Sequence, residues 1–136
     1  MSTGKENSNL ASEFYVMSML HRKGADPSLS KRNKKAINII VDRNGTYLTI
    51  DVKGSLRPIN FPVKYDYYQA DNHYYVFVCY MGKFRDLAVV PEVYVVPSKD
   101  IDLLVTKKPK THIAVVEYKK LKEQARKYKD KWKIFV

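Results

Sequence analysis

A hairpin signal constrains the fold of this chain more than any other feature of its sequence. Two alternating segments, AINIIV and TYLTIDVK, are separated by DRNG, and Asn44-Gly45 is a preferred dipeptide where both turn residues need positive φ. If these two residues form a type I′ turn, Arg43 pairs with Thr46. Counting outward from the turn then places Asn38 opposite Asp51.

The second predicted strand, residues 46–53, has a polar face that combines an acid and a lysine. Side chains two apart in a strand point the same way, so one face carries Tyr47, Thr49, Asp51 and Lys53. An exposed ion pair of this kind contributes little to stability, which is the simpler interpretation. The alternative is part of a metal-dependent site that cleaves phosphodiester bonds.

Length and charge indicate one folded domain that binds a polyanion. The 136 residues suffice for a single core, and 45% of them are hydrophobic. The net charge of +11 favours nucleic acid first and an anionic membrane second. Residues 31–64 hold eight basic and two acidic side chains around the Asp51 strand, whereas residues 106–136 hold eleven and three. The second block is equally consistent with a solvated face.

The remaining periodicities predict a single α/β domain over residues 1–136. We expect residues 1–8 to be disordered, a helix over 8–24, and buried strands near 73–80 and 92–96. Residues 117–132 predict a basic amphipathic C-terminal helix, with an apolar stripe of Tyr118, Leu121, Ala125, Tyr128 and Trp132. Core packing is the favoured interpretation of this stripe, and a dimer seam is the alternative.

Cysteine content and hydropathy predict a soluble cytoplasmic protein. Cys79, the single cysteine, lies in the apolar run HYYVFVCY, so we expect a buried and unreactive thiol. No apolar stretch approaches the ~20 residues that span a membrane. The polar start MSTGKENSN does not resemble a signal peptide.

Most common catalytic motifs are absent, and the pattern Asp51-Val52-Lys53 remains. The chain has no glycine-rich phosphate loop and no serine in a nucleophile-elbow context, and its three histidines lack zinc-site spacing. Glu117-Tyr118-Lys119 fits the same acid–x–lysine pattern. It falls on a predicted helix, however, where residues two apart do not face each other.

The order of these elements resembles the PD-(D/E)XK nuclease superfamily. A helix with an acid, an extended piece, the INIIV strand, a hairpin and the IDVKGS strand follow one another as in that superfamily. The closest resemblance is to the small group akin to archaeal Holliday-junction resolvases and intron-associated endonucleases. It implies a single three-layer, restriction-endonuclease-like domain, in which helices flank a mixed central sheet.

The resemblance also implies roles for individual residues. Asp51 matches the acid that coordinates Mg²⁺ (or Mn²⁺), Lys53 matches the lysine that positions or activates the attacking water, and Glu13 matches an acid that helix one often contributes. Asn38 stands at the position of the family's first acid, so the implied metal ligands are Asp51, Asn38 and Glu13. The expected contacts to nucleic acid come from Lys31, Arg32, Lys34, Lys35, Arg57, Lys64 and Gln69.

Asparagine at position 38 leaves the activity open. Its amide supplies a carbonyl oxygen but no negative charge, so metal binding should be weaker than with a carboxylate. The first hypothesis is therefore a metal-dependent DNA endonuclease of reduced activity, and the second is an inactive, nuclease-derived module that binds nucleic acid. A basic scaffold domain is the third. A homodimer would suit the first, because cutting both strands commonly needs two sites.

Overall fold

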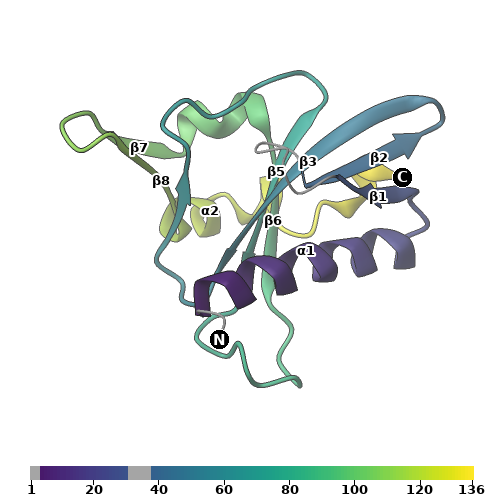
Figure 1. Ribbon diagram of the computed structural model, residues 1–136, viewed down its shortest axis with the longest axis horizontal. Coiled ribbons are helices and arrows are strands. Elements are labelled where there is room, and N and C mark those ends of the chain that lie inside the picture. Colours follow the sequence, from purple (N-terminus) through teal and green to yellow (C-terminus); the bar gives the residue numbers. More distant parts are fainter. Residues whose placement is uncertain (1–3, 31–37) are drawn as a thin grey trace.

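The strands form a mixed sheet, and helix α1 (Gly4–Arg22) lies across one of its faces (Figure 1). The computed structural model describes residues 4–30 and 38–136, and within them a five-stranded sheet has the order β1-β2-β3-β5-β6. Its strands are β1 (Pro27–Leu29), β2 (Ile39–Arg43), β3 (Thr46–Ser55), β5 (His73–Cys79) and β6 (Glu92–Pro97). Strands β3 and β5 are parallel, and the other neighbours are antiparallel.

A second, smaller sheet covers part of the opposite face. Within the described residues it has the order β4-β8-β7, formed by β4 (Asn60–Val63), β8 (Ile113–Glu117) and β7 (Val105–Lys108). The short helices are η1 (Ser98–Leu103), α2 (Tyr118–Glu123), α3 (Ala125–Tyr128) and η2 (Trp132–Phe135). The β7–β8 hairpin projects from one end of the molecule (Figure 1).

The central strands are buried on both faces because their alternate side chains enter two different cores. The core beneath α1 includes Val16, Leu20, Ile50, Val76 and Val95. The core beneath the small sheet and α2 includes Phe61, Phe77, Val96, Val116 and Leu121. This arrangement confirms the predicted α/β domain with a mixed central sheet between two covering layers. The small sheet contributes to one of these layers alongside helices.

The predicted hairpin and its register are confirmed. Asn44 and Gly45 have φ of 54° and 87°, as the turn requires, and Arg43 pairs with Thr46. The β2–β3 ladder continues to the pair Ile39–Ile50. Beyond that pair, the backbone N–H of Asn38 donates to the carbonyl of Ile50 rather than continuing the ladder to Asp51.

The first helix begins earlier than the sequence predicts. Helix α1 starts at Gly4, so the expectation of a disordered start is wrong for residues 4–8, while residues 1–3 lie outside the described part. Ser8 and Ser12 are buried against Gly54 of β3. This tertiary contact gives the first turns of the helix a packing surface that their polar sequence does not reveal.

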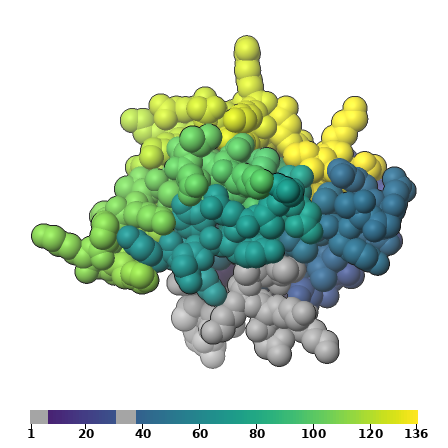
Figure 2. Space-filling view, turned by 90° about the horizontal axis from the view of Figure 1, so that it is seen from above, coloured from purple at the N-terminus to yellow at the C-terminus, as the bar shows by residue number. Residues whose placement is uncertain are grey.

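The C-terminal segment is broken where one helix over 117–132 was predicted. Helix α2 ends before Gln124, α3 ends before Lys129, and Lys129 then forms a β-bridge with Tyr94. The predicted stripe does pack into the core, but Tyr118, Leu121 and Tyr128 join the core beneath the small sheet, whereas Trp132 joins the core beneath α1. One straight helix could not reach both faces of the sheet. Figure 2 shows this segment, in yellow, along one side of the molecule.

A methyl group at position 54 is expected to force α1 away from β3. A Cβ on Gly54 would lie 2.8 Å from the carbonyl oxygen of Ser8 and would overlap the hydroxyl of Ser12. We therefore expect Gly54→Ala to lower the free energy of unfolding by about 2 kcal/mol in a denaturant titration. Adding Ser12→Ala removes only the overlap with the hydroxyl and should restore part of the loss. A Gly54→Ala protein as stable as the natural one would contradict this close contact.

Candidate active site

The side chain of Asn38 organises the edge of β3 beside the candidate site. Its Oδ1 accepts a hydrogen bond of 2.7 Å from the backbone N–H of Val52, where a neighbouring strand would otherwise supply a carbonyl. The backbone carbonyl of Asn38 accepts a hydrogen bond from the N–H of Ser30. Asn38 therefore has a structural role that sequence analysis did not predict.

Asp51 and Lys53 lie side by side on β3, as the strand periodicity predicts. The Lys53 Nζ is 3.5 Å from a carboxylate oxygen of Asp51. The Asp51 side chain is only 8% exposed and that of Lys53 is 25% exposed. The pair is therefore largely removed from water, unlike the surface ion pair of the simpler interpretation.

A cavity of about 650 Å³ lies between α1, the end of β3, the loop that follows it and β4. It brings together five of the residues that the sequence singled out, namely Glu13, Asn38, Asp51, Lys53 and Arg57. Lys64 is not part of the cavity wall, but its charge acts on Asp51. The cavity is large enough for a small ligand or a segment of a polymer backbone.

Burial dominates the electrostatics of Asp51. Loss of water raises the pKa of this carboxyl to about 6, because the ionised form is poorly solvated there. The positive charges of Lys53 and Lys64 lower the pKa, and the negative charge of Glu13 raises it. At neutral pH the carboxylate is thus ionised at a cost in free energy, which a bound cation would offset.

The oxygen donors at the cavity suit a hard divalent cation that keeps part of its water shell. Asp51 and Glu13 supply carboxylates, and Mg²⁺ is commonly held by one or two of these together with substrate phosphates. In the part of the chain that the structure describes, no three His, Cys, Asp or Glu side chains are grouped so as to hold a metal ion. Asn38 Oδ1 already accepts one hydrogen bond and keeps a second lone pair.

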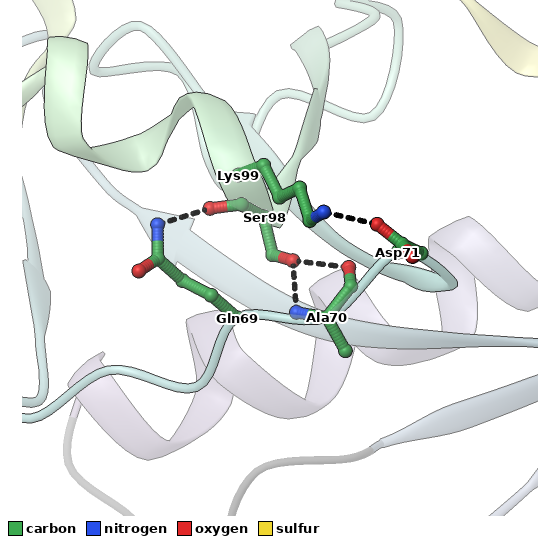
Figure 3. Close-up of polar contacts among 5 residues, drawn as sticks. All are labelled: Gln69, Ala70, Asp71, Ser98 and Lys99. Atoms are coloured by element: carbon green, nitrogen blue, oxygen red, sulfur yellow. Dashed lines mark hydrogen bonds and ion pairs between the residues drawn. The ribbon is translucent and has the colours of Figure 1, made fainter.

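Gln69 is not among the residues that line this cavity, and its predicted contact with nucleic acid stays a prediction. Its Nε2 donates to the backbone carbonyl of Ser98 over 2.9 Å (Figure 3). The Ser98 hydroxyl bonds to the backbone of Ala70, and Lys99 pairs with Asp71. This cluster fastens the loop before β5 to the start of η1. Gln69 follows the acid–x–lysine motif in sequence, but its side-chain N–H group is engaged by the carbonyl of Ser98.

Some predicted residues lie outside the described part of the chain, and some residues of the cavity wall were not predicted. Four predicted contacts to nucleic acid lie outside the described residues, namely Lys31, Arg32, Lys34 and Lys35. The cavity wall also includes polar residues that sequence analysis missed, namely Ser8, Asn9 and Asn60. Gly54 is a signal that could have indicated the α1 wall, because a glycine inside a strand marks a close approach of another backbone.

Comparison with known proteins relates the chain to a nuclease through its structure. No protein-family model and no curated protein sequence matches it. Among solved structures, it is similar to the bacterial homing endonuclease I-Ssp6803I, with a TM-score of 0.54 and 12% sequence identity. The similarity covers 97% of this chain and 86% of the other. The chain therefore shares the overall fold of this endonuclease.

This fold agrees with the predicted architecture, and membership of the PD-(D/E)XK superfamily stays a prediction. The structural similarity covers 97% of this chain, so the cavity residues belong to the part of the fold that the two proteins share. Among residues 4–30 and 38–136, no helix is long and apolar enough to cross a membrane.

Proposed function

We propose that this protein is a divalent-metal-dependent endonuclease that hydrolyses DNA phosphodiester bonds at the cavity beside β3. The observation that carries the proposal is the buried Asp51 carboxylate with Lys53 at 3.5 Å on a cavity wall. An endonuclease fold supports the same reaction class. The net charge of +11 suits a polyanionic substrate.

The residues singled out at and near the cavity have roles that their chemistry allows. Asp51 and Glu13 would hold Mg²⁺ or Mn²⁺, with the amide oxygen of Asn38 as a neutral third donor. A divalent ion held there would supply Lewis-acid chemistry, by polarising the phosphoryl oxygen and making water more acidic. Lys53 would orient the attacking water or offset charge that develops on the phosphate. Arg57 and Lys64 would bind the flanking backbone without reading the bases.

Cellular setting and assembly belong to the same proposal. Cys79 is buried, and burial raises the pKa of its thiol, which suits a protein that works in the reducing cytoplasm. A homodimer would place one cavity on each DNA strand and so allow a double-strand cut.

A binding module without catalysis is the second candidate. The observation that favours it is the hydrogen bond from the Val52 N–H to Asn38 Oδ1, because it commits the residue at the family's first acid position to a structural contact. A site with two carboxylates, from Asp51 and Glu13, binds a metal ion more weakly than a site with a third carboxylate at position 38. The protein would then hold DNA without cutting it.

Cleavage assays with a lysine variant separate the two candidates. Branched, nicked and plain duplex DNA are incubated with the protein and Mg²⁺ or Mn²⁺, beside Lys53→Ala. For an enzyme, we expect the variant to cut at least ~100-fold more slowly, because it loses a group that positions water or a proton. Lys120→Ala is the matched control. The Nζ of Lys120 lies 3.6 Å from a carboxylate oxygen of Glu117, and neither residue lines the cavity.

Each other outcome of this assay has a distinct meaning. Binding by the natural protein with no cleavage would support the second candidate. Equal cleavage by the natural protein and Lys53→Ala would exclude the cavity as the catalytic site. Failure to bind any of these DNAs at low salt would overturn both candidates and leave a scaffold role.

A further inference from the structure

The β7–β8 hairpin carries a concentrated positive charge away from the cavity. From the start of β7 to Val116, the hairpin includes Lys107, Lys108 and Lys110 and no acidic residue. The last residue of β8, Glu117, is acidic, but it lies at the base of the hairpin, where it pairs with Asn60 and its carboxylate is 3.6 Å from Lys120. The hairpin protrudes at one end of the molecule (Figures 1 and 2). Lys108 and Lys110 are exposed, and neither forms an ion pair with a residue that the structure describes. Their charges are therefore available to an external anion.

Hydrogen bonds and a proline hold the tip of the hairpin in one conformation. The Thr111 N–H donates to the carbonyl of Lys108 over 3.2 Å, and the His112 N–H donates to the carbonyl of Pro109 over 3.3 Å. The ring of Pro109 fixes its own φ. A tip restrained in this way loses less conformational entropy when it binds than a free loop does.

Aromatic contacts brace the hairpin, close to its tip, against the loop that follows β4. The Nζ of Lys107 lies 4.8 Å from the ring centroids of both Tyr65 and Tyr67, which is a cation–π geometry. The imidazole of His112 stacks on Tyr65 with a centroid distance of 4.1 Å. Tyr65 is thus packed by its own chain. This argues against base stacking on Tyr65 and in favour of contacts through the lysines.

The hairpin is continuous with the wall of the cavity. Strand β4, whose Asn60 and Pro62 line the cavity, pairs directly with β8. From Glu117, which pairs with Asn60, β8 runs to Ile113 near the tip. At a rise of about 3.3 Å per residue this path is roughly 13 Å long, the length of about four base pairs of DNA.

We propose that the β7–β8 hairpin is a second DNA-binding element that grips duplex phosphates about four base pairs from the cavity, mainly through Lys108 and Lys110. A two-stranded ribbon is narrow enough to follow the major groove, and lysines without base-specific partners bind the backbone. The inference rests on the proposed function, because it assumes that DNA lies across the cavity. Lys107 acts as a positioning residue that holds the hairpin against Tyr65 and Tyr67.

The salt dependence of DNA binding tests this role. Fluorescently labelled duplex DNA is titrated with the natural protein and with Lys108→Gln/Lys110→Gln at several salt concentrations. We expect the slope of log affinity against log salt to become shallower by about 1.8, since each lost phosphate contact contributes about 0.9. Hydroxyl-radical footprints should lose protection about four base pairs from the cavity-bound position.

The matched control removes the same charge from the opposite end of the molecule. Lys131 and Lys133 are exposed and lie close to the C-terminus in sequence. Figure 1 shows the C-terminus at the opposite end of the molecule from the β7–β8 hairpin. Lys131→Gln/Lys133→Gln should leave both the slope and the footprint unchanged. An equal loss in both double variants would indicate a general charge effect and would overturn the assignment to the hairpin. Thermal unfolding of each variant confirms that its fold is intact.

Failure of this inference differs from failure of the proposed function. One outcome would overturn the role of the hairpin alone. In that outcome the natural protein binds duplex DNA, and Lys108→Gln/Lys110→Gln shows the same salt slope and the same footprint. The cavity proposal would then still stand on the Lys53→Ala result. Failure of the natural protein to bind duplex DNA at low salt would overturn the role of the hairpin, and failure to bind branched and nicked DNA as well would also overturn the cavity proposal.

Discussion

Asp51→Asn is expected to stabilise the fold at pH 8 by about 2–3 kcal/mol while abolishing divalent-metal binding. Burial raises the pKa of Asp51 from 3.8 to about 6, so the folded state binds this proton more tightly than the unfolded state does. Stability is therefore lost as the pH rises from about 4 to about 6, where the buried carboxyl must ionise. An amide removes that cost because it carries no charge at any of these pH values.

Thermal unfolding between pH 4 and pH 8 checks this prediction. The variant should melt roughly 6–10 °C higher than the natural protein at pH 8. The difference between the two proteins should nearly vanish by pH 4, because Asp51 is then protonated in the folded state and close to half protonated in the unfolded state. Asp66→Asn, at an exposed position in the loop after β4, is the matched control and should show no comparable gain. A stability gain that persists undiminished at pH 4 would refute the electrostatic explanation.

Asn38→Asp is expected to increase divalent-metal affinity at least about tenfold and to raise any cleavage activity with it. A carboxylate can keep the hydrogen bond from the Val52 N–H and add a negative charge on the wall shared with Asp51 and Glu13. Without metal, the added charge should raise the pKa of Asp51 further and lower stability at neutral pH. Metal binding and stability without metal therefore change in opposite directions.

Calorimetric titration with Mn²⁺ measures this effect independently of catalysis. Asn60→Asp is the matched control, because it adds the same charge to the same cavity from β4 rather than beside Asp51. We expect the control to gain much less affinity than Asn38→Asp. Equal gains in both variants would mean that net charge alone, and not a ligand set around Asp51, governs the metal. No gain in either variant would argue for the binding module.

Short-range geometry explains which parts of the fold and site could be predicted. Asn44 and Gly45 are neighbours in the chain and both tolerate positive φ, so the turn and the register follow from two residues. Asp51 and Lys53 are two apart in a strand and therefore share a face wherever the strand lies. The hairpin register also places Asn38 beside Asp51. The side chain of Asn38, however, accepts a hydrogen bond from the backbone N–H of Val52.

Contacts between distant segments explain the predictions that were wrong. The start of α1 depends on packing of Ser8 and Ser12 against Gly54, which is more than 40 residues away in the chain. The break after α3 depends on the bridge between Lys129 and Tyr94. In both cases a remote partner outweighs the local periodicity, because helix ends gain much of their stability from tertiary packing.

The chain's own residue order determines the turn, the strand faces and the adjacency of an acid and a lysine, since steric preferences act over a few residues. Three-dimensional packing alone decides that Asp51 is buried, that Glu13 and Arg57 share its cavity and that Gln69 does not. The pKa of Asp51 belongs to this second group. Desolvation depends on every element packed around a carboxyl, and those elements come from distant parts of the chain.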